Sequence, residues 1–111
     1  MSTKIWFVYI IRTNDRQLYT GITTDIQRRW REHTTGKGGA RYFRAHRPQS
    51  LCFLEEHPDR SSASKREAAI KQLPKSEKEL LVRMNTIPLD LTLNNPTADF
   101  QSEATNLEHI T

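Results

Sequence analysis

The stretch from Ile5 to Ile11 constrains the fold more than any other part of the chain. All seven of its residues are apolar, and most of them are β-branched or aromatic. A strand at the surface of a sheet alternates apolar and polar residues, whereas an uninterrupted apolar run is typical of a strand covered on both faces. We therefore predict that residues 5–11 form the central strand of a small sheet.

The residues that follow this strand predict a hairpin. Residues 13–17, Thr-Asn-Asp-Arg-Gln, supply turn chemistry, so Leu18 to Ile22 is expected to return antiparallel to the first strand. This pairing brings Tyr9 and Tyr19 onto neighbouring strands. Gly21, near the end of the second strand, suits a position where the backbone bends or is approached closely.

A helix is predicted next, with Thr24 or Asp25 as its N-cap. Three residues at helical spacing form an apolar stripe that faces the sheet: Ile26, Trp30 and His33. Arg29 points only about 60° away from the direction of Ile26, and His33 follows one turn after it. Spacing alone favours a flanking arginine with a buried stem and a histidine that is satisfied in the core.

Residues 36–49 form a predicted loop, because three glycines and Pro48 interrupt any regular pattern. Basic and aromatic side chains are interleaved in it: Lys37, Arg41, Tyr42, Phe43, Arg44 and Arg47. Guanidinium groups bind phosphates, and a ring such as that of Tyr42 can stack on an unpaired base. The alternative, which the sequence supports equally, is a solvated loop in which Phe43 fills the core beneath.

The second half of the chain predicts one more strand and two more helices. Residues 50–55 complete a three-stranded antiparallel sheet, and a helix capped by Ser61 or Ser62 then runs to Leu73. The last helix, residues 76–85, begins with Ser76 and Glu79 at capping-box spacing. Its expected buried residues are Leu80, Leu81 and Met84. The expected fold is thus an α/β protein of the α+β type.

Glu67 lies on the face of its helix that is expected to meet the sheet, between Ala63 and Ile70. An inward carboxylate needs a partner, because desolvating an unpaired charge is costly. The residues leave two explanations open. Glu67 forms a capping box with Ser64 if the helix starts late, or it holds a divalent cation near Arg29 and the tyrosines.

Charge is unevenly distributed along the chain, whose formal net charge is +4. All 17 basic residues and nine of the 13 acidic ones lie within residues 1–85, which therefore carry +8. The other four acids are Asp90, Asp99, Glu103 and Glu108. We expect a basic domain over residues 1–85 and an acidic, mobile tail over residues 86–111. Basic domains of this kind commonly bind polyanions.

Cys52 is the only cysteine, which excludes an internal disulfide and fits a reducing compartment. It lies in the apolar run from Leu51 to Leu54 and is expected to fill space in the core rather than act as a nucleophile. No stretch is long enough to cross a membrane. We expect a cytoplasmic protein without a membrane partner.

The ordered set of these residues resembles the GIY-YIG nuclease family. Its two signature tripeptides correspond to the segments Val8-Tyr9-Ile10 and Tyr19-Thr20-Gly21, and the resemblance covers about residues 4–83. The glycine-rich segment of residues 36–41, with Arg47, Pro48 and Glu67, is similar to the small stand-alone bacterial members, the YhbQ-like group. Phe7 and Thr20 depart from the pattern, at the places of the first glycine and the middle isoleucine.

The resemblance implies a metal-dependent nuclease with a GIY-YIG endonuclease-like fold. Its catalytic residues would be Tyr9, Tyr19, Arg29, His33 and Glu67. A single Mg²⁺ or Mn²⁺ bound by Glu67 would stabilise the leaving oxygen, Arg29 would clamp the phosphate, and Tyr9 would take the proton of the attacking water. The nucleic-acid-binding residues would be Lys37, Arg41, Tyr42, Arg44 and Arg47.

The expected substrate is DNA in preference to RNA, in repair or processing, with its branched or linear form and the oligomeric state left open. Two other functions fit the residues. The first is a nucleic-acid-binding module of the same fold that does not cut. The second is an interaction domain whose basic face meets an acidic protein partner.

Overall fold

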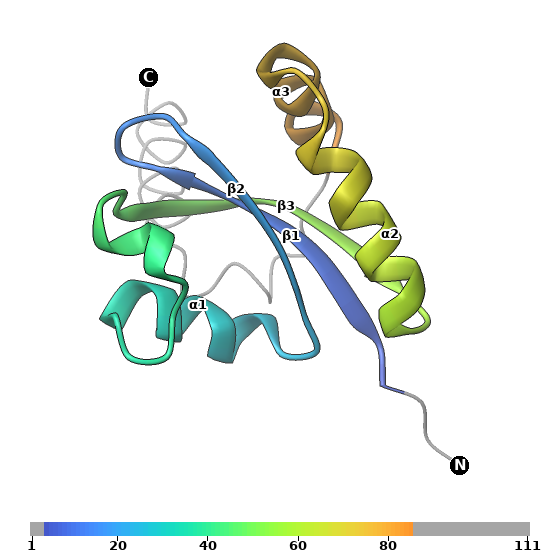
Figure 1. Ribbon diagram of the computed structural model, residues 1–111, viewed down its shortest axis with the longest axis horizontal. Helices are drawn as coiled ribbons and strands as arrows, with labels where there is room; N and C mark the ends of the chain where they lie inside the picture. The colour runs from blue at the N-terminus through green and yellow to red at the C-terminus, as the bar shows by residue number, and fades with distance from the viewer. Residues whose placement is uncertain (1–3, 86–111) are drawn as a thin grey trace, which may run out of the picture.

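The computed structural model describes residues 4–85, which fold into a three-stranded antiparallel sheet with helices on both of its faces (Figure 1). The elements are β1 (Trp6–Thr13), β2 (Leu18–Thr23), α1 (Ile26–Thr35), the 3₁₀-helix η1 (Arg41–Arg44), β3 (Pro48–His57), α2 (Arg60–Lys71) and α3 (Lys75–Met84). The predicted α+β class is confirmed. Residues 86–111, expected as an acidic tail, lie outside the described residues, so the division at residue 85 stays a prediction.

The strand order is β2-β1-β3, which confirms that the apolar run forms the central strand. In the β1–β2 register Tyr9 lies opposite Gly21, and in the β1–β3 register it lies opposite Leu54. β3 is longer than predicted at both ends, and β-bulges interrupt its register with β1 beside Ile11 and Thr13. Gly21 therefore lies on an edge strand, directly beside the central Tyr9.

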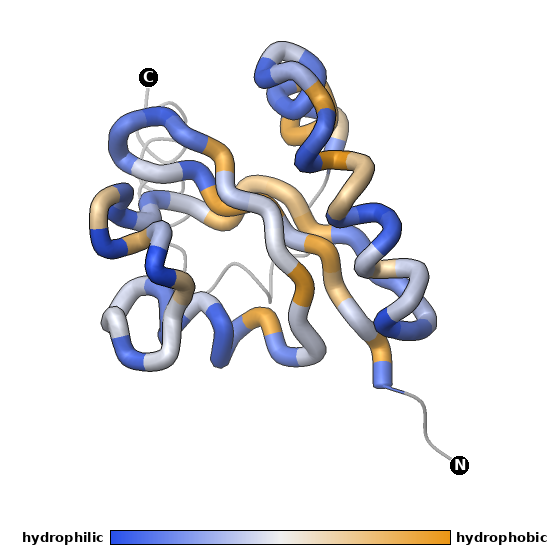
Figure 2. Tube along the Cα trace, viewed as in Figure 1, coloured by the Kyte–Doolittle hydropathy of each residue, from blue (hydrophilic) through white to orange (hydrophobic). Residues whose placement is uncertain are grey.

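The two faces of β1 contribute to two separate hydrophobic clusters. Tyr9 and Ile11 pack with Ile26 and Trp30 of α1, while Val8 and Ile10 pack on the other face with residues of α2. Figure 2 shows hydrophobic positions along the strands and on the helices, and hydrophilic positions in the β1–β2 turn. Because neighbouring strand residues point to opposite faces, the uninterrupted apolar run is explained by burial on both sides.

The first two helices begin at aspartates. The Asp25 side chain accepts a hydrogen bond from the backbone N–H of Arg28, as one of the two predicted caps of α1. The α2 helix is capped by Asp59, whose side chain accepts from Ser62 N, so the predicted caps Ser61 and Ser62 are wrong. Asp59 takes the N-cap position in place of the two serines because it directly follows Pro58, where the strand is broken. Ser64 thus lies inside the helix, which rules out a capping box with Glu67.

The last helix differs most from its prediction. Its N-cap is Pro74, which makes no side-chain cap, so Ser76 and Glu79 do not form the predicted box. Glu79 instead accepts two hydrogen bonds of 2.8 Å from the guanidinium of Arg12 on β1. Leu80 and Met84 are 50% and 74% exposed and not buried as predicted, because α3 continues from the end of α2 and lies beside the end of the sheet (Figure 1).

Among residues 4–85, no helix combines the length and the apolar composition that crossing a bilayer requires.

Candidate active site

Tyr9 and His33 meet beneath the sheet, where the central strand crosses α1. Tyr9 is 1% exposed and His33 is 2% exposed. The phenolic oxygen of Tyr9 lies 2.9 Å from Nε2 of His33, within hydrogen-bond distance. Both side chains are placed by the periodicity of their elements, since Tyr9 points to the α1 face of β1 and His33 belongs to the buried stripe of α1.

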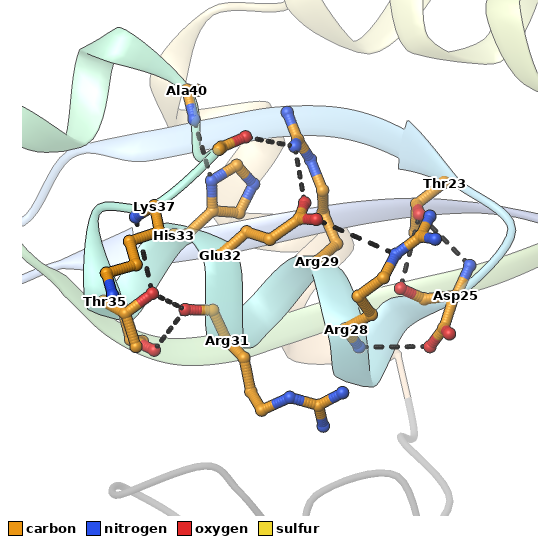
Figure 3. Close-up of polar contacts among 12 residues, drawn as sticks. Thr23, Asp25, Arg28, Arg29, Arg31, Glu32, His33, Thr35, Lys37 and Ala40 are labelled. Atoms are coloured by element: carbon orange, nitrogen blue, oxygen red, sulfur yellow. Dashed lines mark hydrogen bonds and ion pairs between the residues drawn. The ribbon is translucent and has the colours of Figure 1, made fainter.

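The loop that follows α1 decides which nitrogen of His33 carries the proton. The backbone N–H of Ala40 donates to Nδ1 of His33 at 3.1 Å, so Nδ1 must keep its lone pair (Figure 3). Burial, and then the positive charge of Arg29, lower the pKa of His33 to about 4. At neutral pH the ring is therefore uncharged with its proton on Nε2, and His33 donates that proton to the Tyr9 oxygen.

Arg29 is the second group that acts on Tyr9. Burial raises the pKa of Tyr9 to about 12, and Arg29 offsets part of this increase as a hydrogen-bond donor and as a positive charge. His33 is thus within hydrogen-bond distance of the phenolic oxygen, and Arg29, also on α1, acts on the same group. Both interactions stabilise negative charge on this oxygen, although burial opposes them.

Gly21 provides the space in which the Tyr9 ring lies. A Cβ at this position would stand 2.5 Å from the phenolic oxygen and 2.6 Å from the ring carbon that bears it. Real side chains do not tolerate such contacts, so only glycine admits the ring here. The close approach expected at Gly21 is therefore the approach of Tyr9 itself.

Tyr19 is half-buried beside Tyr9 and joins a group of aromatic rings. Its ring centroid lies 6.3 Å from that of Tyr9, 5.7 Å from His33, 5.3 Å from Tyr42 and 4.8 Å from Phe43. Phe43 is 7% exposed and fills the core, as the loop alternative predicted. The rings link the buried Tyr9 to the partly exposed Tyr42.

Glu67 lies on α2, between the buried Ala63 and Ile70, and its side chain is 23% exposed. Within residues 4–85 its carboxylate forms an ion pair with Nζ of Lys71, at 3.1 Å. The charge of Glu67 contributes to the raised pKa of Tyr9, so the two groups interact electrostatically across the edge strand. Of the two explanations, the capping box is excluded, and the cation stays a prediction beside the partner that Lys71 supplies.

A metal site built on Glu67 would have few protein ligands. No group of three or more His, Cys, Asp or Glu side chains within residues 4–85 is arranged to hold a metal ion. A single carboxylate nevertheless fits Mg²⁺, which keeps several waters and is commonly bound by one or two carboxylates together with substrate phosphates. The donor set is thus compatible with a cation that is completed by substrate.

The predicted nucleic-acid-binding residues lie together on the segment between α1 and β3. Four of them are exposed cations: Lys37, Arg41, Arg44 and Arg47. Tyr42 is half-buried, and its ring stacks on His46 with centroids 4.3 Å apart and an interplanar angle of 21°. Asp15 of the β1–β2 turn binds His46 at 2.6 Å, which ties this segment to the turn. Arg41 and Arg44 belong to the same 3₁₀-helix as Tyr42.

Two contributors were missed by the sequence analysis. Glu32 binds Arg29 at 2.8 Å, and its spacing of three residues along the helix could have revealed it. Gly39 allows the loop to lie on α1, because a Cβ there would stand 2.5 Å from the carbonyl oxygen of Glu32. This contact brings Ala40 to His33. Outside this group, Asn85 at the end of α3 accepts a hydrogen bond from the backbone N–H of Leu54 at 3.0 Å and donates to its C=O at 3.1 Å.

Comparison with known proteins identifies the family. The GIY-YIG catalytic domain matches residues 5–80 of this chain. The UPF0213 protein DP2720 of Desulfotalea psychrophila is 55% identical over 78 residues, which are 70% of this chain and 71% of that protein. The UPF0213 protein YhbQ of Escherichia coli O1:K1 / APEC is 42% identical over 98 residues, which are 88% of this chain and 97% of that protein.

The solution NMR structure of the UPF0213 protein BH0048 from Bacillus halodurans matches 80% of this chain and 94% of that chain, with 36% identity and a TM-score of 0.49. The domain match covers more than half of the chain, and the match to YhbQ covers almost the whole of that relative. The resemblance predicted from the two tyrosine-bearing strands is confirmed. This chain belongs to the GIY-YIG family and to its YhbQ-like UPF0213 group.

Proposed function

We propose that this protein is a divalent-metal-dependent nuclease that hydrolyses phosphodiester bonds of DNA in preference to RNA. GIY-YIG is a nuclease family whose members generally use divalent metal ions, which supports the reaction class. The observation that carries the proposal is the pair of donors, His33 Nε2–H and the Arg29 guanidinium, that act on the Tyr9 oxygen. The Arg29 part of this arrangement offsets some of the increase that burial causes in the pKa of Tyr9, in the direction of the phenolate that a general base requires.

In the proposed reaction, the oxygen of a water molecule attacks phosphorus while the bond from phosphorus to the leaving oxygen breaks. Tyr9, as phenolate, accepts the proton of that water, and His33 holds and stabilises the phenolate through Nε2–H. Arg29 binds the non-bridging oxygens, whose charge grows in the transition state. Tyr19 orders the rings around Tyr9 and is the second candidate for the proton acceptor.

Glu67 would hold Mg²⁺ or Mn²⁺, which when bound supplies charge stabilisation for the leaving oxygen. Neutralising Glu67 also has an effect within the protein. Because the negative charge of Glu67 raises the pKa of Tyr9, a cation at Glu67 removes that contribution and favours the phenolate. Binding of the cation at Glu67 and ionisation of Tyr9, the proposed base, are then coupled.

Lys37, Arg41, Arg44 and Arg47 would bind the phosphates on either side of the cleaved bond, and Tyr42 would contact a base or sugar. We assign the protein to DNA repair or processing, because a small domain that carries few base-reading groups is suited to recognising structure rather than sequence. The lone Cys52 is compatible with a cytoplasmic location.

A second candidate is a nucleic-acid-binding module that does not cut, and the raised pKa of Tyr9 favours it. A tyrosine with a pKa of about 12 is almost entirely protonated at neutral pH and is then a poor base. Incubation with supercoiled plasmid, single-stranded and branched DNA, with and without Mg²⁺ or Mn²⁺, separates the two functions. Metal-dependent cleavage supports the nuclease, and binding without cleavage supports the module.

The Glu67→Gln variant makes this test specific to the proposed site. Glutamine keeps the length of the side chain and removes the charge that a hard cation needs. Cleavage should collapse while the fold survives, and affinity for DNA without metal should hold or rise. Glu77→Gln, at an exposed glutamate in the first turn of α3, is the matched control and should cut like the parent. Cleavage at the parent rate in Glu67→Gln would sink the metal assignment.

A further inference from the structure

Glu32 contacts two arginines of its own helix, Arg28 and Arg29 (Figure 3). Its Oε1 accepts a hydrogen bond of 2.8 Å from Nη1 of Arg29, and its Oε2 lies 3.8 Å from Nε of Arg28. The side chains of Glu32 and Arg29 are 30% and 28% exposed, whereas that of Arg28 is 57% exposed. Arg29 is thus the closer and the better shielded partner.

The same nitrogen of Arg29 makes a second hydrogen bond. Nη1 also donates to the carbonyl oxygen of Gly38 at 2.9 Å. Gly38 is held near Glu32 because the next residue, Gly39, lies against the backbone of α1 where no Cβ would fit. Nη1 of Arg29 is therefore held by two acceptors, Glu32 on the helix and Gly38 on the loop that follows it.

These two bonds determine which edge of the guanidinium is left for a substrate. An arginine has five N–H donors, and the two on Nη1 are both used by Glu32 and Gly38. The donors outside these two bonds are on Nη2 and Nε, so the interaction of Arg29 with Tyr9 and any hydrogen bond to phosphate oxygens must come from this planar edge. With Nη1 tethered, this edge has one orientation relative to Tyr9.

The carboxylate of Glu32 also affects substrate electrostatically. Its hydrogen bond from Arg29, and further the charges of Arg29 and Arg28, lower the pKa of Glu32, so it stays ionised at working pH. A fixed negative charge beside the arginine that binds phosphate repels the substrate. Partly exposed ion pairs contribute little to stability, so stability alone is a weak reason for accepting this repulsion.

We propose that Glu32 is a positioning residue for Arg29, which aligns the Nε and Nη2 donors with the phosphate at the cost of weaker substrate binding. The inference rests on the proposed nuclease function and adds a residue to it. Glu32 touches neither Tyr9 nor substrate, and it acts through Arg29. The orientation of Arg29 and the affinity for DNA can therefore be separated by experiment. The orientation needs a hydrogen-bond acceptor at the position of Oε1, whereas the affinity depends on the negative charge of Glu32.

Three variants separate these effects: Glu32→Gln, Glu32→Ala and the control Glu77→Gln. The glutamine at position 32 keeps an acceptor for Nη1 but loses the charge, whereas the alanine loses both. Measurements are kcat and KM on DNA, affinity for DNA without metal, and the rotation of the Arg29 guanidinium observed by ¹⁵N NMR. Thermal unfolding of each variant reports its stability.

Glu32→Gln should keep kcat within about twofold and bind DNA roughly threefold more tightly than the parent. Glu32→Ala should bind equally tightly but lose kcat on the order of 100-fold, with faster rotation of the Arg29 guanidinium. Glu77→Gln should match the parent in every measurement. If Glu32 had only a structural role, Glu32→Ala would lose unfolding temperature and activity in step. It would not combine a lower kcat with tighter binding of DNA.

Retention of kcat in Glu32→Ala would overturn the proposal, and so would an Arg29 guanidinium that stays as ordered in the alanine variant as in the parent. The NMR and affinity measurements do not depend on cleavage. If the parent does not cut DNA at all, the nuclease function fails, and the orienting role of Glu32 is then decided by the guanidinium rotation alone.

Discussion

Gly21 and Tyr9 face each other across the β1–β2 pair, and a methyl group on Gly21 would stand 2.5 Å from the Tyr9 oxygen. We predict that Gly21→Ala displaces the Tyr9 ring and lowers cleavage on the order of 100-fold. Overpacking of this kind should reduce stability by about 1–3 kcal/mol. Steady-state cleavage and urea unfolding measure the two effects.

Gly36→Ala is the control for this substitution. Gly36 has a φ of 81° at the end of α1 and no atom within 4 Å of a built Cβ, so alanine there strains the backbone without touching Tyr9. It should lower stability by about 1 kcal/mol and leave cleavage nearly unchanged. Equal losses of cleavage in both variants would mean that Gly21 acts through stability alone.

The lowered pKa of His33 predicts how stability changes with pH. The folded state holds His33 neutral down to about pH 4, whereas an unfolded histidine binds a proton near pH 6.5. Between these values the unfolded state binds more protons, so the free energy of unfolding should fall as pH falls from 6.5 to 4, by about 3 kcal/mol from this group. Urea unfolding at several pH values measures the decrease.

Other carboxylates also titrate at low pH, so the effect of His33 is read as a difference between proteins. His33→Gln should lack this component, and its stability curve should be flatter than that of the parent between pH 4 and 6.5. His46→Gln, at a partly exposed histidine that binds Asp15, serves for comparison. Parallel curves for the parent and His33→Gln would show that His33 is not held neutral.

The raised pKa of Tyr9 predicts the pH dependence of cleavage. If Tyr9 must be ionised to accept a proton, the ionised fraction and kcat should rise about tenfold per pH unit below the pKa of the complex. Tyr9→Phe should abolish this rise together with activity, while Tyr19→Phe should keep the slope. A kcat that is constant between pH 6 and 9 would exclude Tyr9 as the base.

The segment between α1 and β3 should determine the salt dependence of DNA binding. Replacing Arg41, Arg44 and Arg47 with alanine should reduce the slope of log affinity against log salt by roughly three times 0.9 for duplex DNA. Titrations from low to moderate salt measure the slope. Alanine at Lys65, Lys78 and Arg83, which lie on α2 and α3, removes the same charge and should change it little.

Thr20 carries a buried polar group that costs stability. It is 3% exposed, and within residues 4–85 its Oγ1 has no hydrogen-bond partner. Valine has nearly the same shape without the hydroxyl, so Thr20→Val should raise the free energy of unfolding by roughly 1 kcal/mol. Thr13→Val removes a hydroxyl that bonds Asp15 and Gln17 and should instead destabilise the protein. A destabilised Thr20→Val would indicate a partner for this hydroxyl.

The sequence by itself determined the parts of the fold that depend on neighbours along the chain. The apolar run placed β1 at the centre of the sheet, and Asp25 was one of two caps named for α1. The 3.6-residue period directed Arg29 and His33 toward the sheet. These inferences succeed because backbone geometry repeats along an element, so residue spacing alone tells which side chains share a face.

Only the tertiary structure decided which partners these side chains meet. The proton on His33 Nε2 depends on Ala40, which the loop brings back onto α1, and the partner of Glu79 is Arg12 on a strand 67 residues away. The cap at Asp59 excluded one reading of Glu67, and the position of α3 left Leu80 exposed. Such pairings depend on the packing of whole elements, which residue spacing within one element does not encode.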